Sequence, residues 1–570
     1  MTIPAMMRRQ RLLRSAWLCC TLVLASSLAG CGTPSAAGPA DTYGLDFSLP
    51  EGSKTSGAII FLVDGLNGEF FEQMLNDGEL PAFKKYFVDR GLYAPRAVAN
   101  VPSITLVNLT SIATGRFAGH HGIVANQTFD RNRLMWRDYE TIAQKNTLDD
   151  DYIVPTVFEM LPGETTVSVF FQPHRKATKF IENWTSAGPP FYFGWFEFVD
   201  RLTLFRLSMV GDIARHRRAW PAVTVVYLLA PDFRAYLHGF SSPQYREAIL
   251  HADRQIGRVC GDLERAGLLD KLHIAVVSDH GHADVQTHFP LRPFFKRLGL
   301  EMVEAHAPRD MPFEKLMAYY EPYSAVAFGG GDRYFALSLR KPAPDDSGRR
   351  YEAWNVRPDA ADLADYPVSP KHSGAKRVDL IAELIARAEI DAVAFRNGDN
   401  CVRVARGNGE VEFRQPAGPG GDIGYHVLRG EDPFGWAGKV PAEALDGKPL
   451  SPRAWLEATH ATEYPDLPAQ IVAYFRSRYA PDLIAFSVPG TDLFAVHKAG
   501  HGGLRPADMF VPLLVAGPGV PHGRVDAARS VDVIPTVLQL QGRQPPPGLD
   551  GASIVPTPAT QAAPATQPAE

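Results

Sequence analysis

Three short, mostly apolar runs in the first half of the chain each lead into an aspartate. They are residues 58–63 before Asp64, residues 223–231 before Asp232 and residues 273–278 before Asp279. Runs this short and this rich in Val and Ile are typical of central strands in a parallel sheet. Ligands of open α/β sheets collect beyond the carboxyl ends of the strands. The pattern therefore predicts that three carboxylates converge on one small volume. Because like charges at this spacing repel, it also predicts a positive partner, most simply a cluster of metal ions.

From residue 58 to about residue 290, such runs alternate with helical patterns, which is the signal of repeated βαβ units. The clearest helix spans residues 242–266, where Ile249, Ile256 and Leu263 keep one face apolar. We therefore predict an α/β fold with a mostly parallel central sheet flanked by helices.

The segment from about residue 295 to 490 has a different pattern. Gly- and Pro-rich turns separate short alternating stretches such as residues 392–395 and 402–405, which indicates an inserted α+β cap. Apolar runs like those of residues 58–290 recur at residues 509–519 and 531–540. We expect these two to close the core.

One aromatic segment, residues 189–209, has two interpretations. It is either a helix packed over the core or an element that faces a membrane or a substrate.

The N-terminus has the pattern of a targeting segment. An arginine-rich start precedes an apolar stretch at residues 16–28, which is too short for a comfortable membrane span. The following Leu28-Ala-Gly-Cys31 resembles the lipobox of bacterial lipoproteins, which implies cleavage before Cys31 and lipid attachment to it. A plain secretory peptide with an incidental cysteine is the alternative. The lipobox interpretation predicts anchoring in the cell envelope. Gly32 favours the outer membrane, with the folded part in the periplasm or exposed outside.

Composition narrows the class of protein. The 570 residues are 45% hydrophobic and 21% charged, an ordinary globular balance, and the formal net charge is −5 although the first 30 residues carry four arginines and no acid. An acidic body argues against binding to duplex nucleic acid. Of five cysteines, only Cys260 and Cys401 lie beyond the targeting segment and the lipidation site, and whether they pair is left open.

The predicted organisation follows from these boundaries: signal peptide and lipidated cysteine 1–31, flexible tether 32–56, first part of the α/β core 57–294, inserted α+β cap 295–490, closing part of the core 491–551, and disordered tail 552–570.

A candidate nucleophile lies at Thr105. It precedes an apolar helical pattern, so it suits a helix N-terminus, where backbone N–H groups and the helix dipole favour an anion such as phosphate. A threonine hydroxyl attacks well only when a base or a metal lowers its pKa. Asn108, one turn later, is expected on the same face, where it could donate to a phosphoryl oxygen.

Histidines accompany the aspartates. His280 follows Asp279 directly, and His501 lies among glycines in the stretch Ala499-Gly-His-Gly-Gly503. Mixed aspartate and histidine ligation suits zinc, whereas ligation mainly by oxygen suits magnesium or calcium.

These motifs, in this order, resemble the alkaline phosphatase superfamily, and most closely its type I phosphodiesterase/nucleotide pyrophosphatase branch. The matching stretches are Val63-Asp-Gly65, Pro102-Ser-Ile-Thr-Leu-Val-Asn108, Thr114-Gly115, His121-Gly-Ile123, Pro231-Asp232, Ser278-Asp-His-Gly281 and Gly500-His-Gly-Gly503. The resemblance covers about residues 57–290 and 495–551. It implies an alkaline-phosphatase-like fold, a phosphoenzyme on Thr105 and two divalent metal ions, most simply Zn²⁺.

The resemblance also implies two ligand sets. Asp64, Thr105, Asp279 and His280 would hold one ion. Asp232, His501 and a histidine shortly after Asp232 would hold the other. The branch usually places that histidine four residues after the aspartate, where this chain has Tyr236, and the nearest histidine is His238. We assign His238 to the second ion. A Tyr236 phenolate, or a weak or empty second site, remains open. His282, His288 and His497 also lie near the motifs and could compensate, but none of them is assigned.

The expected function is metal-dependent hydrolysis of a phosphoric diester or pyrophosphate, with a phosphorylated small molecule or a lipid head group as substrate. A phosphomonoesterase of the same superfamily and a non-catalytic envelope lipoprotein with a degenerate metal site are the alternatives.

Overall fold

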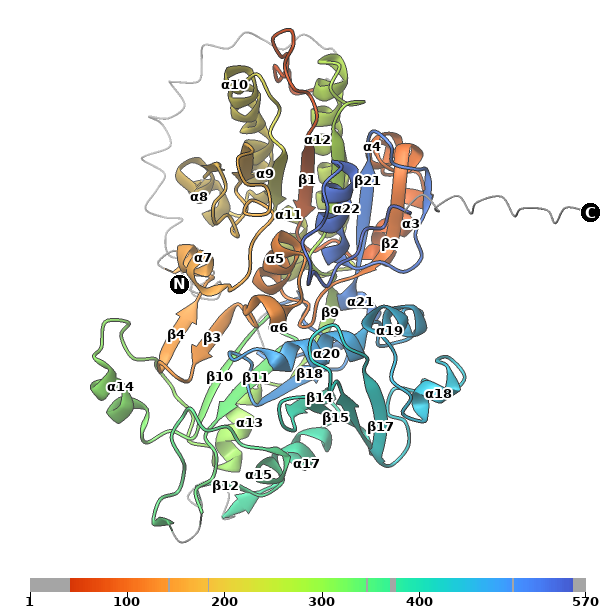
Figure 1. The fold of residues 1–570 in the computed structure, drawn as a ribbon. Helices are drawn as coiled ribbons and strands as arrows, with labels where there is room; N and C mark the ends of the chain where they lie inside the picture. The colour runs from red at the N-terminus through yellow and green to blue at the C-terminus, as the bar shows by residue number, and fades with distance from the viewer. Residues whose placement is uncertain are drawn as a thin grey trace, which may run out of the picture.

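The computed structural model describes residues 42–141, 144–182, 184–344, 347–369, 376–494 and 497–556. An eight-stranded sheet forms the centre of the larger half of the molecule (Figure 1). Its strands, in spatial order, are β22 (Gly523–Arg524), β2 (Gly91–Val98), β21 (Phe510–Ala516), β8 (His273–Val277), β1 (Ala58–Val63), β7 (Val223–Leu228), β5 (Thr166–Val169) and β6 (Lys179–Ile181). Strands β8, β1, β7, β5 and β6 run parallel, and β21 pairs antiparallel with both β8 and β2. The three strands that precede the aspartates are therefore direct neighbours.

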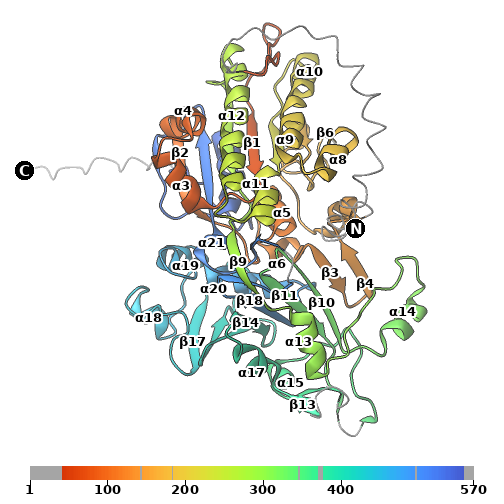
Figure 2. The same ribbon diagram turned by 180° about the vertical axis from the view of Figure 1, so that it is seen from behind.

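Both faces of this sheet are buried, which explains why β1 consists only of apolar residues. Its side chains alternate between two cores: Ile60 points into one, and Ile59 and Phe61 point into the other. Helices α5 (Thr105–Thr114) and α22 (Val533–Leu540) cover the first face, and α12 (Pro243–Arg265) covers the second, as Figures 1 and 2 show from opposite sides. The predicted fold class is confirmed, and α12 begins and ends within one residue of the predicted helix.

The remaining helices of this half surround the sheet. They are α3 (Gly68–Asn76), α4 (Pro81–Tyr86), α6 (Ala118–His121), α7 (Leu148–Asp151), α8 (Trp184–Tyr192), α9 (Phe196–Phe205), α10 (Leu207–Arg217), α11 (Ala230–His238) and α21 (Pro506–Met509). The aromatic segment, residues 189–209, forms the end of α8, all of α9 and the start of α10. Phe196 is buried in a small cluster beneath these helices, whereas Phe193, Trp195 and Phe205 are more than half exposed. The segment therefore has one packed and one exposed side.

The inserted cap lies below the central sheet in Figure 1 and is built on a second, antiparallel sheet of seven strands. In spatial order these are β10 (Ala325–Gly330), β11 (Tyr334–Leu339), β18 (Leu483–Ser487), β14 (Ile390–Arg396), β15 (Cys401–Arg406), β16 (Gly409–Arg414) and β17 (Gly424–Arg429). Its helices are α13 (Leu291–Leu298), α14 (Phe313–Tyr320), α15 (Ala360–Ala364), α17 (Leu380–Ile385), α18 (Ala442–Leu445), α19 (Pro452–Thr459) and α20 (Leu467–Arg476). Two hairpin strands, β3 (Gln127–Asp130) and β4 (Met135–Asp138), lie beside it.

The cap and the core approach closely at α6 and α20. A Cβ atom on Gly119 would lie 1.6 Å from the carbonyl oxygen of Ala473, so only glycine allows the two backbones this distance. One continuous apolar core runs through the contact, including Ile104 of the first half and Tyr334 of the cap. The two parts therefore pack as one body.

A small three-stranded sheet carries part of the site. It consists of β19 (Gly490–Asp492), β9 (Ala283–His288) and β20 (Ala499–Gly500). Gly500 pairs with Ala283, which brings His501 beside the segment that contains His280 and His282. Residues far apart in the sequence are thus joined at the carboxyl end of β8.

Part of the segment predicted as a flexible tether, residues 43–47, packs against the core. Leu45 and Phe47 are buried, the backbone N–H groups of Tyr43 and Leu45 donate to Asp262, and Phe47 packs edge-on against Trp220. An aspartate on α12 thus holds a segment whose Gly- and Pro-rich composition suggested a free linker. The signal peptide, Cys31 and tail residues 557–570 lie outside the described residues.

Cys260 and Cys401 are both free. Within the described part of the chain, each helix is too short or too polar to cross a bilayer.

Candidate metal centre

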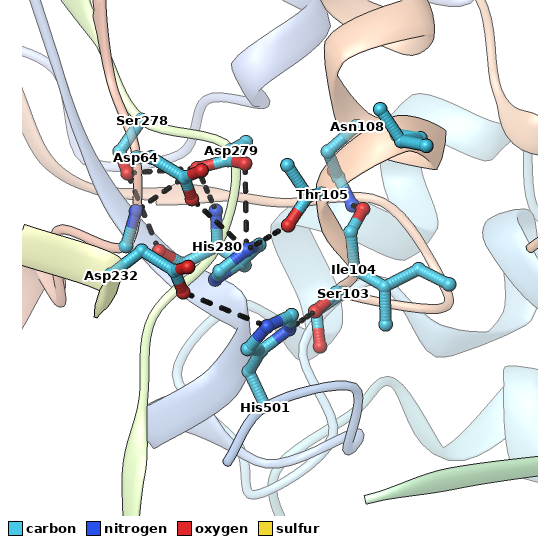
Figure 3. A network of polar contacts seen from close by, with 12 residues as sticks. Asp64, Ser103, Ile104, Thr105, Asn108, Asp232, Ser278, Asp279, His280 and His501 are labelled. Carbon is cyan, nitrogen blue, oxygen red and sulfur yellow. Dashed lines mark hydrogen bonds and ion pairs between the residues drawn. The ribbon is translucent and has the colours of Figure 1, made fainter. Parts of the chain in front are cut away.

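The three strand-end aspartates meet at one edge of the central sheet (Figure 3). Asp64 follows β1, Asp279 follows β8 after one residue, and Asp232 lies in the first turn of α11 after β7. All three are at most 3% exposed. Thr105 begins α5 and faces this cluster, with its hydroxyl Oγ1 3.1 Å from Nε2 of His280. Parallel neighbouring strands end at the same edge, which is why the sequence pattern located this volume.

One group of donor atoms comprises Asp64, Asp279 and His280. Nε2 of His280 lies 3.3 Å from Oδ1 of Asp64 and 3.4 Å from Oδ2 of Asp279. The other carboxylate oxygens already have donors: the Tyr227 hydroxyl donates to Asp64, and the Gly65 N–H donates to Oδ1 of Asp279 at 3.1 Å. Oδ1 of Asp64 and Oδ2 of Asp279 are buried and have no hydrogen-bond partner within the described structure. Both oxygens lie beside Nε2 of His280 with their lone pairs available.

A second group comprises Asp232, His280, His282 and His501, whose ligand atoms all lie within 4.8 Å of one another. Nε2 of His282 is 2.8 Å from Oδ1 of Asp232, and Nε2 of His501 is 3.8 Å from the same oxygen. The rings of His280 and His501 stack with centroids 3.5 Å apart and planes 10° apart. His280 belongs to both groups, so the two groups adjoin.

Backbone carbonyls assign the tautomers of two histidines. Nδ1 of His501 lies 2.7 Å from the Ser103 carbonyl oxygen, and Nδ1 of His280 lies 3.1 Å from the Gly281 carbonyl oxygen. A carbonyl only accepts, so each Nδ1 carries the proton and each Nε2 presents a lone pair to the cluster. This is the arrangement in which outer contacts orient metal-ligating histidines.

Two glycines allow the close approach of the backbone and side chains in the donor groups. Gly65 has a positive φ of 72°, and a Cβ atom there would lie 2.8 Å from Cα of Asp232 and 2.9 Å from Nε2 of His282. A Cβ on Gly281 would lie 2.1 Å from the Ala507 carbonyl oxygen. The glycines that follow Asp64 and His280 are therefore steric requirements of the site.

Burial dominates the electrostatics. Desolvation raises the pKa of Asp279 to about 7 and that of Asp232 to about 8, and the pKa of Asp64 is raised by desolvation and by repulsion from the other two carboxylates. Desolvation also lowers the pKa of His282 to about 3 and keeps the pKa values of His280 and His501 well below normal. The histidines are therefore neutral, which is their metal-binding state.

The donor set fits divalent cations. Three buried carboxylates face three neutral imidazoles, and no arginine or lysine forms an ion pair with the carboxylates within the described structure. Without a positive partner the carboxyl groups would take up protons, whereas a divalent cation compensates their charge directly. Mixed nitrogen and oxygen donors are the ligands that zinc prefers.

The structure gives Asn108 a role different from the predicted one. It is fully buried, its amide donates to the carbonyl oxygens of Pro102 and Ile104 at 3.1 Å each, and its Oδ1 accepts from the Asn100 N–H at 2.6 Å. Its side chain points back along α5 into the preceding loop, as side chains of helices do (Figure 3). Asn108 therefore braces the loop that presents Thr105 and is not directed at a phosphoryl oxygen.

Another amide contacts the first turn of α5. Oδ1 of Asn126 accepts from the Leu106 N–H at 3.0 Å. The sequence gives no local signal for this contact, because it depends on the path of the chain after α6.

His238 is the second residue whose position differs from the prediction. It is exposed at the end of α11 and is absent from both donor groups, whereas His282 is fully buried beside Asp232. Residue 238 lies six positions after Asp232 on a continuous helix, so its side chain points to another face. Position 236, four residues on, returns to the face of Asp232, and the Tyr236 hydroxyl lies 2.6 Å from Nε2 of His501. His282 is among the histidines near the motifs to which the sequence alone assigns no role. Its place in the Asp-His-Gly-His pattern at a strand end is the signal that could have singled it out.

Comparison with known proteins gives a family for this geometry. Residues 58–391 match the model of the type I phosphodiesterase / nucleotide pyrophosphatase family. A venom phosphodiesterase of Naja atra is 24% identical over 341 residues, which are 55% of this chain and 37% of that protein. The ectonucleotide pyrophosphatase/phosphodiesterase family member 1 of Mus musculus is 25% identical over 227 residues, which are 39% of this chain and 24% of that protein.

The chain thus matches 37% of the length of the first of these curated relatives and 24% of the length of the second. The family match, by contrast, extends over more than half of this chain and contains Asp64, Thr105, Asp232 and Asp279. The protein belongs to the type I phosphodiesterase/nucleotide pyrophosphatase family, within the alkaline phosphatase superfamily.

Proposed function

We propose that the protein hydrolyses phosphoric diesters or pyrophosphates, with Thr105 as the nucleophile and two divalent cations, most simply Zn²⁺, in the two donor groups. The observation that carries the proposal is the position of Thr105 at the start of α5, with Oγ1 3.1 Å from Nε2 of His280 and beside the carboxylates of the first group. The names of the relatives, phosphodiesterase and nucleotide pyrophosphatase/phosphodiesterase, agree with this class of reaction.

The chain's own residues prepare the first step. Thr105 is partly exposed among buried neighbours, so a substrate can reach its hydroxyl. The N-terminus of α5, a ten-residue helix, presents positive partial charge to an incoming phosphoryl group. The hydroxyl attacks phosphorus, a Thr105–phosphate ester forms, and the bond to the leaving alcohol or phosphate breaks. Water then cleaves the Thr105 ester and regenerates the hydroxyl.

Asp64, Asp279, His280 and Thr105 would hold one cation. Bound in the two groups, the cations would supply the charge that lowers the pKa of the attacking hydroxyl and neutralises the phosphoryl oxygens.

An arginine near the site is already paired with an aspartate, which supports a phosphate diester over a monoester as the substrate. Arg333 is fully buried behind His501, and its Nη1 lies 2.8 and 2.7 Å from the two carboxylate oxygens of Asp508. Its charge is therefore not free to bind the second negative charge of a phosphate monoester. A phosphomonoesterase remains the second candidate within the same superfamily.

The test compares bis-p-nitrophenyl phosphate with p-nitrophenyl phosphate as substrates. We expect zinc-dependent turnover with a higher kcat/KM for the diester, and loss of turnover by at least about 1,000-fold in Thr105→Ala. Preference for the monoester would favour the second candidate. A metal-free protein without turnover of either substrate would favour a binding lipoprotein with a degenerate site.

We also propose that the chain is anchored in the cell envelope through lipid on Cys31. The support is the sequence pattern of residues 28–31, which lie outside the described part of the structure. Mass spectrometry of the mature N-terminus, with Cys31→Ser as the control, tests it. An unmodified Cys31 in the mature protein would contradict it.

A further inference from the structure

The second donor group has an unusual composition on α11. The helix carries Asp232 in its first turn, and position 236, one full turn later, faces the cluster with a phenol in place of an imidazole. His280 belongs to both groups. Apart from it, Asp232 and His501 would give the second group two protein donors. Catalytic zinc sites ordinarily use three. The missing donor must come from Tyr236, from His238 or from another element.

His238 lacks the geometry for this role. It is the last residue of α11, its side chain is exposed, and it contacts neither Asp232 nor His501 in the described structure. Reaching the cluster would require unwinding the end of the helix, where the Gly239 N–H donates to the Ala235 carbonyl oxygen at 2.8 Å.

Tyr236 contacts the second donor group through a hydrogen bond to His501. Its hydroxyl lies 2.6 Å from Nε2 of His501, and its ring contacts those of His282 and His497 with centroids 5.4 and 4.5 Å apart. Nδ1 of His501 carries the proton that it donates to Ser103, so Nε2 accepts the Tyr236 hydrogen bond. The phenol and a cation therefore compete for the same lone pair.

His282 has the required position. It enters from the loop after β8, two residues after His280, and is fully buried. Nε2 lies 2.8 Å from Oδ1 of Asp232, a hydrogen-bond distance. A shift of about 0.5 Å would bring the two atoms to the roughly 3.3 Å that separates two ligands of a tetrahedral zinc ion. The backbone between the two histidines is fixed, because the Gly281 N–H donates to the Asp508 carbonyl oxygen at 2.8 Å. The absence of a side chain at Gly65 leaves space for the imidazole.

We propose that His282 is the third protein ligand of the second cation, together with Asp232 and His501, and that Tyr236 is a neighbour of this site and not a ligand. The inference rests on the proposed function for the presence of a second cation, and it adds the ligand set of that cation in this chain. The donor that α11 lacks at position 236 is supplied by the loop after β8. The ligand class is a divalent cation that accepts one carboxylate and two imidazoles, which favours zinc over magnesium or calcium.

The test counts zinc on the full-length protein by elemental analysis after equilibration at a buffered free Zn²⁺ concentration. We expect two ions per chain in the wild type and one in His282→Ala, with a Kd of the second site weakened by more than about 100-fold, beyond the effect of losing an outer contact. His238→Ala is the matched control and should retain two ions. Tyr236→Phe should also retain two, with equal or tighter binding, because the competing hydrogen bond is removed.

A second variant covers the case in which His282→Ala does not fold. His282→Gln keeps much of the volume and a donor to Asp232 but is a poor zinc ligand, so it should bind one ion while its circular dichroism matches the wild type. Two ions in either folded His282 variant, or one ion in His238→Ala or Tyr236→Phe, would overturn the ligand assignment. Two ions in the wild type without phosphodiester turnover would refute the proposed function and leave the His282 assignment intact.

Discussion

Asp279→Asn should stabilise the cation-free protein while weakening its stabilisation by zinc. Asp279 is fully buried, and desolvation raises the pKa of its carboxyl from an ordinary value near 3.8 to about 7. Each tenfold change in an ionisation constant corresponds to about 1.4 kcal/mol, so the ionised folded state is penalised by about 4 kcal/mol relative to the unfolded chain.

The direction of the pH dependence follows from this raised pKa. Below about pH 3.8 the carboxyl is protonated in both states, and the penalty is absent. The penalty grows as the pH rises toward 7, because the unfolded state releases the proton first, and it is constant above that pH. Without cations, the variant and the wild type should therefore be similarly stable near pH 4, and the variant should be more stable by up to about 4 kcal/mol at pH 8.

Asparagine fits the site without losing hydrogen bonds. Its Oδ1 can still accept from the N–H groups of Gly65 and His280, which lie 3.1 Å from Oδ1 of Asp279. Its amide nitrogen replaces Oδ2 and faces the unpartnered Oδ1 of Asp64. The substitution therefore mimics the protonated carboxyl and removes a charged cation ligand.

Urea unfolding followed by circular dichroism, with EDTA or with zinc, measures both effects. At zinc concentrations 100 times its Kd, the wild type should gain about 2.7 kcal/mol for each bound ion, and the variant should gain less. Asp270→Asn is the control, because that side chain is 85% exposed and its removal should change the free energy of unfolding little. A variant no more stable than the wild type at pH 8 in EDTA, or one with wild-type zinc stabilisation and turnover, would refute this account of the cluster.

The other expectations test single elements of the architecture. Asn108→Ala should lower the free energy of unfolding by about 1–3 kcal/mol in urea titrations, because it leaves the buried Asn100 N–H unpaired, and an unchanged stability would contradict its bracing role. Thr105→Ser should keep more turnover of bis-p-nitrophenyl phosphate than Thr105→Ala, since it retains the hydroxyl, and equal rates would argue against the nucleophile. Gly119→Val should prevent stable folding through the contact with Ala473, whereas Gly188→Ala, with no atom within 4 Å of its Cβ position, should leave the melting temperature within a few degrees.

The pattern of apolar residues predicted where the three aspartates lie, because neighbouring residues in the sequence determine which segments form strands and where those strands end. The runs that precede Asp64, Asp232 and Asp279 become adjacent strands β1, β7 and β8, and parallel neighbours end at one edge. Thr105 was recognisable because a hydroxyl before an apolar helical pattern predicts a helix N-terminus.

The remaining features depend on contacts that sequence spacing does not determine. The side chain of Asn108 leans toward the start of its helix and pairs with the loop before Thr105, whereas counting turns places it beside the nucleophile. His282 approaches Asp232 because of the turn at Gly281 and the packing of β9 against β20. The ordered segment at Leu45 depends on one aspartate of α12 more than 200 residues away.

The most direct test of the central claim is anomalous X-ray diffraction at the zinc edge from crystals of the full chain grown with zinc. The account predicts two peaks, one contacting Asp64, Asp279, His280 and the Thr105 hydroxyl, and the other contacting Asp232, His282 and His501. A map without a peak between these side chains, or with zinc bound only elsewhere on the molecule, would contradict it.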